Sequence, residues 1–510
     1  MRAWQGCVLN KIAKGFGELW HKSRTRRIVH RFLSIPSTFM YSRFYKVLNW
    51  FNGLMFSLGE KLRPAVDNSQ IFGLCRKISA SGFVNNSAVL SGIKKLGMRG
   101  ILIAAFAMYL PLDVFIRDVI GVDALSSIWD EAFLLLCVGY ILWDMVIIRK
   151  SRIKPSVTPL DATIIFFMCA GLFVMAVVSP KLSIAIAGYR AVCQFMLWFF
   201  VLTRLLRSER DIEIFYFSVC IMAVCVAFHS IYQYVVGVEI PANWVAASEV
   251  GVRTRAFSIT GSPNILGSLM VLCAPMIAAL IYYVKPLWLK LVMWGLTIVM
   301  CLATLVTFSR GAWFGLAVAV VLFCLMVDIK LLLIAVVGAM GVILCVPEIS
   351  NRIAFLFTSD FAAANSAGGR AQRWEIGWRL LRTNPIFGFG LGRFGGAIAM
   401  QNQVVEGIDY FYMDNYYMKT LVEMGYVGLV SYLYLLLRKI LWSVRGIFKT
   451  RKKPISLLSR GMFCGMMGVL AHSYFENIFE VPYMNSYFWG FAAAIMCIGF
   501  LRRKPMENNK

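Results

Sequence analysis

Long apolar stretches, separated by short polar turns, make up most of the chain from residue 100 onward. A stretch of roughly 20 apolar residues is long enough to cross a bilayer as an α-helix. Because backbone groups inside a bilayer must be hydrogen-bonded within their own segment, such stretches predict membrane-spanning helices. About twelve spans are expected, at residues 100–117, 128–148, 161–179, 184–206, 212–236, 264–284, 287–307, 311–328, 330–347, 413–437, 458–475 and 483–501.

The first hundred residues follow a different pattern. Residues 1–99 contain seventeen Lys and Arg against three acidic residues, and the basic residues interrupt every apolar stretch. Residues 44–58 mix aromatic, aliphatic and polar positions, which favours an amphipathic helix at a membrane surface. We therefore expect a basic cytoplasmic or interfacial N-terminal segment, residues 1–99, followed by a polytopic membrane domain, residues 100–510. The predicted fold is an all-α helix bundle.

Composition agrees with this prediction. Of the 510 residues, 59% are hydrophobic and 15% are charged, and the mean hydropathy is +0.69. Soluble domains carry about 25% charged residues. The net charge of +26 is compatible with a nucleic-acid partner. However, the basic residues cluster at the ends of apolar stretches, where they anchor helices at a cytoplasmic membrane surface. Binding of nucleic acid is therefore not expected.

Basic residues also predict the orientation, because they are enriched in cytoplasmic turns. If the N-terminus is cytoplasmic, every second turn is basic, with Lys or Arg at residues 149–152, 204–210, 285–290, 330, 438–453 and 502–504. Both termini are then cytoplasmic. The alternate turns are then expected on the outer side of the membrane. Two of them are long, residues 237–263 and one large outer loop at about residues 348–412.

The enrichment of basic residues in cytoplasmic turns does not explain arginines in the outer segments, so their presence there needs another explanation. Arg190 lies within a predicted span, where a charge costs about 2.5 to 3.5 kcal/mol, so it requires a partner or a function. Arg253 and Arg255 precede the turn Gly261-Ser262-Pro263-Asn264, in which Asn264 can cap the next helix. Snorkelling to headgroups or pairing with a nearby acid remains an alternative for each arginine.

Three further arginines fall on the same predicted side. Arg310 lies in the tight turn Ser309-Arg310-Gly311, and Arg370 and Arg373 share one face of a predicted amphipathic helix. A guanidinium group can donate two parallel hydrogen bonds to phosphate oxygens, and it stays charged. Several of them at membrane level suit a lipid diphosphate.

Groups that can accept a proton lie in the same region of the sequence. Asp414 and Asn415 stand at the start of a predicted span, with Tyr417 and Glu423 downstream, and His472 lies near the end of the next span. A carboxylate at a helix N-terminus can equally be a cap. These residues are candidates for a general base beside the arginines.

The run Gly390-Leu391-Gly392-Arg393-Phe394-Gly395 matches the dinucleotide-binding pattern G-x-G-x-x-G. That pattern requires a strand before it and a helix after it in a βαβ unit. Neither context is present, so these glycines indicate a tight turn against membrane helices.

The motifs described above, in their order along the chain, resemble those of the O-antigen ligase and polymerase superfamily of bacterial envelope glycosyltransferases. The resemblance extends from Arg190 to about Pro482 and rests on Arg190, Arg255 with Gly261-x-Pro263-Asn264, Ser309-Arg310-Gly311, Arg370 with Trp374 and Pro385-x-x-Gly388-x-Gly390, Asp414-Asn415-x-Tyr417 with Glu423-x-Gly425-x-x-Gly428, and His472.

The resemblance implies a bacterial inner-membrane enzyme without metal or other cofactor. It would transfer glycan from an undecaprenyl-diphosphate-linked oligosaccharide to an acceptor hydroxyl on the outer face. The resemblance implies Asp414, Glu423 and His472 as catalytic candidates, Asp414 being favoured. It implies substrate binding by Arg190, Arg255, Arg310, Arg370, Arg373, Asn415 and Tyr417. A chain-length regulator is a further partner left open.

Ligases of this superfamily typically have His-Asn where this chain has Asp414-Asn415, which favours a polymerase over a ligase. Two other classes remain as alternatives. A lipid-linked oligosaccharide flippase would also carry arginines in a helix bundle, but at mid-membrane or on both sides. A metal-dependent glycosyltransferase would use acids of the first outer loop, where Asp118, Asp123, Asp130 and Glu131 lie. These acids form no Asp-x-Asp pair, and helix capping explains Asp130 and Glu131.

Overall fold

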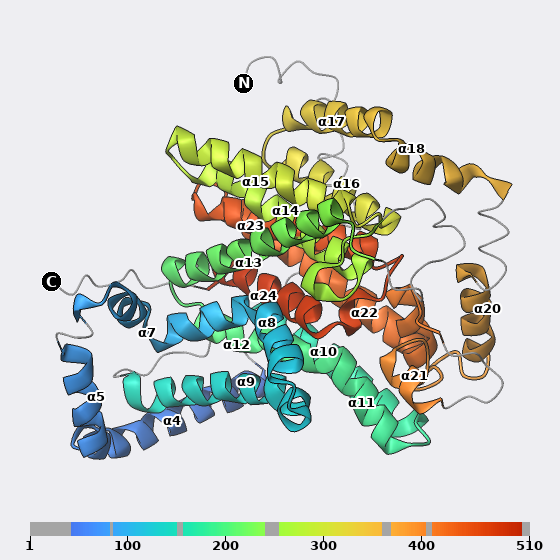
Figure 1. Cartoon of the computed structure of the whole chain (residues 1–510). Helices are drawn as coiled ribbons and strands as arrows, with labels where there is room; N and C mark the ends of the chain where they lie inside the picture. The colour runs from blue at the N-terminus through green and yellow to red at the C-terminus, as the bar shows by residue number, and fades with distance from the viewer. Residues whose placement is uncertain are drawn as a thin grey trace, which may run out of the picture.

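The computed structural model describes residues 42–81, 85–149, 157–239, 254–359, 369–403 and 411–501, and the described residues are helical almost throughout, with no strand (Figure 1). The predicted all-α class is confirmed. Arg253 and the basic residues 502–504 lie outside the described residues. The elements are α4 (Arg43–Asp67), α5 (Gln70–Ala80), α7 (Ala88–Ala107), α8 (Tyr109–Val114), η1 (Phe115–Ile120), α9 (Asp123–Trp143), η2 (Asp144–Ile148), α10 (Asp161–Val178), α11 (Leu182–Cys193), η3 (Gln194–Met196), α12 (Leu197–Leu205), α13 (Glu209–Val236), η6 (Ser258–Thr260), α14 (Pro263–Tyr283), α15 (Leu287–Leu305), α16 (Arg310–Met326), α17 (Leu331–Cys345), α18 (Pro347–Ala354), η7 (Phe355–Phe357), α20 (Arg370–Leu381), α21 (Ala397–Asn402), α22 (Tyr416–Lys449), α23 (Ile455–His472), η8 (Ile478–Glu480) and α24 (Pro482–Gly499).

Each of the twelve predicted spans falls on a helix or on consecutive helices. By length and composition, eight helices in the described residues can cross a membrane, or up to ten if two bent pairs are counted. The bent pairs are α7 with α8 and η1, at 75°, and α17 with α18, at 92°. Helix α16 is shorter than a full span, with 17 residues. The chain is therefore a multi-pass membrane protein, and the predicted count of twelve is not confirmed.

Helices α14, α16 and α23 pack closely at the centre of the bundle (Figure 1). Glycines on α23 allow this approach, because a side chain at Gly461 or Gly465 would meet backbone carbonyls of α14, and one at Gly468 would meet α16. Small residues at such spacing let membrane helices gain close van der Waals contact. Helix α24 is buried along nearly its whole length, whereas α17 has no buried residue. The core thus lies around α14, α23 and α24.

Helix α22 is broken at Gly425, where φ is +65° and ψ is −166°. The segment from Pro385 to Gly390 fills the break with its backbone. Its hydrogen bonds to α22 are Phe389 N to Val422 O at 2.7 Å, Gly390 N to Glu423 O at 3.0 Å, Tyr426 N to Pro385 O at 2.9 Å and Val427 N to Ile386 O at 3.1 Å. Backbone groups freed by the break are satisfied in this way. The predicted tight turn against membrane helices is confirmed.

Replacing Gly425 by alanine should destabilise the protein by at least about 2 kcal/mol. This backbone conformation is open to glycine alone at no cost, and a Cβ at Gly425 would also lie 2.5 Å from the Gly388 nitrogen. Thermal unfolding in detergent, followed by circular dichroism, measures the loss. The control is Gly338→Ala in α17, where no atom lies within 4 Å. Equal melting temperatures for the two variants would contradict the role assigned to the break.

Candidate functional site

Asp414 and Arg370 form the centre of the candidate site. The Asp414 Oδ2 atom accepts a hydrogen bond from Arg370 Nε, and Arg373 Nη1 lies 3.7 Å from the same oxygen. Asp414 immediately precedes the Asn415 N-cap of α22, while both arginines belong to the first turn of α20. The structure therefore brings together three predicted site residues from two segments 44 residues apart.

Packing of α20 on α22 holds the two arginines in place. On its buried side, α20 presents Gly377, Leu380 and Leu381. The two leucines join Met418 and Val422 of α22 in a small apolar cluster. A Cβ at Gly377 would lie 2.8 Å from the terminal methyl group of Met418, so the two helices approach closely. The helix predicted to begin at Arg370 is confirmed. Its predicted apolar face, Trp374, Trp378 and Leu381, is only partly correct, because Trp378 is exposed.

Each arginine makes one further contact with a neighbouring segment. Arg370 Nη2 donates to the Phe475 carbonyl at 3.2 Å, and its guanidinium lies 5.8 Å from the centre of the Phe475 ring. Arg373 Nη1 donates to the Tyr412 carbonyl at 3.3 Å. These contacts fix the guanidinium groups but leave Arg370 and Arg373 partly exposed. Both groups can thus bind an anion that arrives from outside the protein.

The second carboxylate oxygen of Asp414 remains available. Oδ1 is buried and has no hydrogen-bond partner among the described residues. A buried acceptor without a donor is rare because its desolvation is not compensated. Asp414 can therefore accept a hydrogen bond, or a proton, from a hydroxyl group that enters this position.

Glu476 adds a second carboxylate beside this pair. Burial raises the pKa of Glu476, the negative charge of Asp414 raises it further, and Arg370 lowers it. The side chain accepts hydrogen bonds from Asn264 Nδ2 at 2.5 Å and from the Asn477 backbone at 3.1 Å. The Arg370 guanidinium therefore has two carboxyl groups in its surroundings, Asp414 and Glu476.

Asn264 connects Glu476 to Arg255. Its Oδ1 accepts a hydrogen bond from Arg255 Nη2 at 3.2 Å, and Arg255 Nε donates to the Thr307 carbonyl at 3.0 Å. Ser262 occupies the N-cap position of α14, without a side-chain capping bond. The prediction that Asn264 caps this helix is therefore wrong, because its side chain points to Arg255 and Glu476 instead.

His472, near the end of α23, lies against Gly311 in the first turn of α16. His472 is buried, and its Nδ1 lies 2.9 Å from Ser268 Oγ in α14. A Cβ at Gly311 would lie 2.9 Å from His472 Nε2, which places the residue next to Arg310 directly against the imidazole. Arg310 begins α16, whose N-cap is Ser309. The structure thus brings the start of α16 to the end of α23.

Arg190 lies apart from this group. It forms an ion pair with Glu131 of α9 and donates from Nε to Gln194 at 3.1 Å. Its side chain is 54% exposed. In the described residues no contact joins it to Asp414 or Arg370. Glu131 therefore provides the partner that a charge within this span requires.

Tyr417 and Glu423, the remaining candidates on α22, have intramolecular partners. The Tyr417 hydroxyl donates to the Leu470 carbonyl at 2.8 Å. Glu423 is 2% exposed and forms an ion pair of 2.6 Å with Lys419, and its other oxygen accepts from the Phe394 backbone at 3.2 Å. Lys419 was not among the predicted residues. Its spacing from Glu423, i to i+4 within an apolar span, is the signal that identifies the pair.

Asn415, a predicted substrate-binding residue, caps α22. Its side-chain oxygen accepts a hydrogen bond from Met418 N at 2.9 Å. Asn415→Ala should therefore lower the free energy of unfolding by about 1 kcal/mol, whereas Asn415→Ser should keep most of it. Thermal unfolding of both variants measures this difference. A melting temperature of Asn415→Ala equal to that of the wild type would exclude the capping role.

Comparison with known proteins bears on the same residues. Residues 295–433 match the family model described as O-antigen ligase, and this range includes Arg310, Arg370, Asp414 and Glu423. No curated protein matches the chain. The match confirms the superfamily predicted from the sequence motifs. This multi-pass membrane protein is thus O-antigen ligase-like over residues 295–433.

Proposed function

We propose that the protein is a polysaccharide polymerase. It transfers glycan from an undecaprenyl-diphosphate-linked oligosaccharide to the hydroxyl group of an acceptor glycan, without a metal ion. The O-antigen ligase domain supports a membrane glycosyltransferase-like function of this type in polysaccharide biosynthesis. The observation that carries the proposal is the pair of Arg370 with Asp414, in which one carboxylate oxygen is held and the other is buried without a donor.

The two residues suit the two charges that change in this reaction. Asp414 Oδ1 accepts the proton of the acceptor hydroxyl while the hydroxyl oxygen forms a bond to the anomeric carbon of the donor. The bond between this carbon and the diphosphate oxygen breaks, and undecaprenyl diphosphate leaves. Arg370 and Arg373, with Arg255 and Arg310 nearby, stabilise the negative charge on the leaving diphosphate.

Two other candidates are less suited to the role of base. Glu423 has both oxygens engaged, by Lys419 and by the Phe394 backbone. His472 is buried against Gly311 and has Ser268 at one ring nitrogen. We assign both to support of the site, and we assign Arg190, which is paired with Glu131, to contact with a more distant part of the substrate.

The proposal places the Asp414 end of the bundle on the outer face of the bacterial inner membrane. Arg99, Arg149, Arg207 and Arg210 gather at the other end, near the first turn of α13. Basic residues at one end of a helix bundle favour a cytoplasmic location of that end. A lipid-linked oligosaccharide on the outer leaflet would then reach Asp414.

The description of the matched family favours a second candidate, an O-antigen-type ligase, which transfers a finished glycan once to a lipid acceptor. Purified protein is incubated with lipid-linked repeat units, with and without a chelator, and the products are separated by size. A ladder of products in the presence of chelator is expected. A single transfer that requires an added lipid acceptor would favour the ligase, and a requirement for metal would contradict both.

A further inference from the structure

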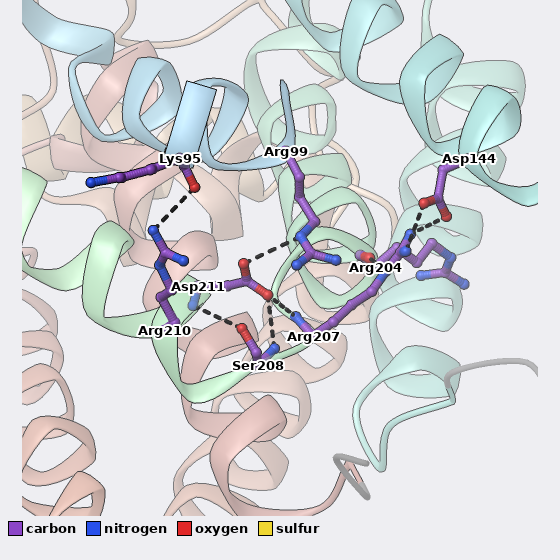
Figure 2. Close-up of polar contacts among 8 residues, drawn as sticks. All are labelled: Lys95, Arg99, Asp144, Arg204, Arg207, Ser208, Arg210 and Asp211. Atoms are coloured by element: carbon purple, nitrogen blue, oxygen red, sulfur yellow. Dashed lines mark hydrogen bonds and ion pairs between the residues drawn. The ribbon is translucent and has the colours of Figure 1, made fainter. Parts of the chain in front are cut away.

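A cluster of arginines joins α7, the end of η2 and the start of α13. Figure 2 shows Arg99, Arg207 and Arg210 of this cluster with Asp144 and Asp211. Arg99 Nε donates to Asp211 Oδ1 at 3.2 Å. Arg149 Nε donates to Asp144 Oδ2 at 2.7 Å, and Arg207 Nη1 donates to Asp144 Oδ1 at 2.9 Å. Guanidinium groups from α7, η2 and the turn before α13 thus meet around two carboxylates.

Helix α13 separates this cluster from the candidate site. Asp211 lies in its first turn, whereas Gln233, in its last turn, accepts hydrogen bonds from the backbone of Phe257 and Ser258 just before α14. Asn264, at the start of α14, bonds to Glu476 beside Asp414. The 28 residues of α13 span about 42 Å. The cluster is therefore at the opposite membrane surface.

The guanidinium groups are not neutralised by the carboxylates that they contact. Two carboxylates, Asp144 and Asp211, pair with three arginines, Arg99, Arg149 and Arg207. A fourth arginine, Arg210, lies at the edge, where its Nη2 donates to the Lys95 carbonyl at 3.1 Å. Burial lowers the pKa of Arg149, and the positive charges of Arg207 and Arg99 lower it further, against the effect of Asp144.

Donor groups also remain open in this cluster. Both Nη atoms of Arg99 and both Nη atoms of Arg149 donate to no atom of the described residues. Asp211 Oδ2 already accepts from the backbone of Arg207 and Ser208, and both oxygens of Asp144 are in use. Crowded guanidinium groups with open donors suit a phosphate oxygen, which can accept two of them.

Apolar surface borders the cluster and indicates which phosphate it binds. Trp143 and Ile148, on either side of the Asp144 helical turn, are exposed. Helix α4 packs on the same turn, where Arg63 Nε donates to the Val146 carbonyl at 3.0 Å, and its Leu58 and Leu62 are exposed as well. A ligand with a charged head and apolar chains fits both surfaces, whereas free phosphate fits the cluster alone.

We propose that Arg99, Arg149 and Arg207, with Arg210 at the edge, form a binding site for the phosphate group of an anionic phospholipid. Basic groups between membrane helices at the cytoplasmic surface bind anionic lipid headgroups. The bound lipid neutralises the excess charge and connects α7, η2 and α13, so anionic lipid stabilises the bundle.

The test compares nanodiscs of phosphatidylcholine with nanodiscs that also contain phosphatidylglycerol, using full-length protein. Phosphatidylglycerol should raise the melting temperature of the wild type. Native mass spectrometry should show about fivefold weaker retention of phosphatidylglycerol in Arg149→Gln, because one direct contact to the phosphate is lost. Arg99→Gln should behave in the same way and replaces Arg149→Gln if that variant does not fold.

The matched control is Arg445→Gln. Arg445 lies at the same end of the bundle, since the adjacent Gly446 packs on Gly499, and its guanidinium lies 4.9 Å from the centre of the Trp442 ring. This variant should keep the full effect of phosphatidylglycerol. Equal loss in the control and in Arg149→Gln would overturn the proposal, because it would indicate a general charge effect. Equal stabilisation by inorganic phosphate in phosphatidylcholine nanodiscs would overturn the assignment to a lipid.

Discussion

Asp414→Asn should lower the rate of polymer formation by about 10² to 10⁴, the usual contribution of a general base. The amide has the size of the carboxylate but cannot take the proton of the acceptor hydroxyl. Because Asp414 is also held by Arg370, the comparison should be made at saturating donor, where a drop in kcat reports the lost base. Initial rates with purified lipid-linked repeat units measure the effect.

Two controls separate loss of the base from other causes. Glu375→Gln removes an exposed acid on the same helix as Arg370 and should leave the rate unchanged. Arg370→Lys keeps the positive charge but loses the paired donors, so it should raise KM for the donor and should lower kcat by less than Asp414→Asn does. Wild-type kcat in Asp414→Asn would remove Asp414 from the role of base, whatever the behaviour of Arg370→Lys.

Lys419→Met should lower the free energy of unfolding by about 3 to 5 kcal/mol, because it leaves the Glu423 carboxylate buried without its partner. Lys419 and Glu423 are 6% and 2% exposed and lie 2.6 Å apart. The carboxylate also accepts from the Phe394 backbone, so the loss should extend to the loop that fills the break in α22. Thermal unfolding in detergent gives the size of the effect.

The double variant Lys419→Met with Glu423→Gln serves as the control. It removes both charges while keeping an acceptor for Phe394, and replacement of a complete buried pair is often nearly neutral. We expect it to recover most of the stability lost in Lys419→Met. A double variant as unstable as the single one would show that Lys419 stabilises the protein by something other than its pairing with Glu423.

Sequence pattern was sufficient for the helices whose apolar stretches have clear ends. The predicted span 264–284 and the observed α14, Pro263–Tyr283, differ by one residue at each end because a proline begins the helix. The predicted span 413–437 was too short, since α22 continues to Lys449. Hydropathy falls at Arg438 and Lys439, yet both are buried, and Lys439 lies over the Phe488 ring. Tertiary contacts therefore extend the helix beyond its apolar pattern.

The candidate site was only partly visible in the sequence. Residue type and the predicted side of the membrane identify Arg370, Arg373 and Asp414 as candidates, and the structure places them in contact. The partner of Arg190 could not be predicted, because Glu131 is 59 residues away and is as well explained by helix capping. Arg255 is linked through Asn264 to Glu476, and Asn264 and Glu476 are 212 residues apart in the sequence. Local sequence patterns do not predict a contact between residues so far apart.

The break in α22 also has a consequence for biogenesis. The amides of Phe389 and Gly390 find their acceptors at Val422 and Glu423, more than thirty residues later in the chain. Because a ribosome delivers the chain from its N-terminus, these amides have no native acceptor until α22 has been synthesised and inserted. The end of the bundle that carries Asp414 is therefore completed late in translation, and a nascent chain stalled before residue 422 should expose this loop to proteases.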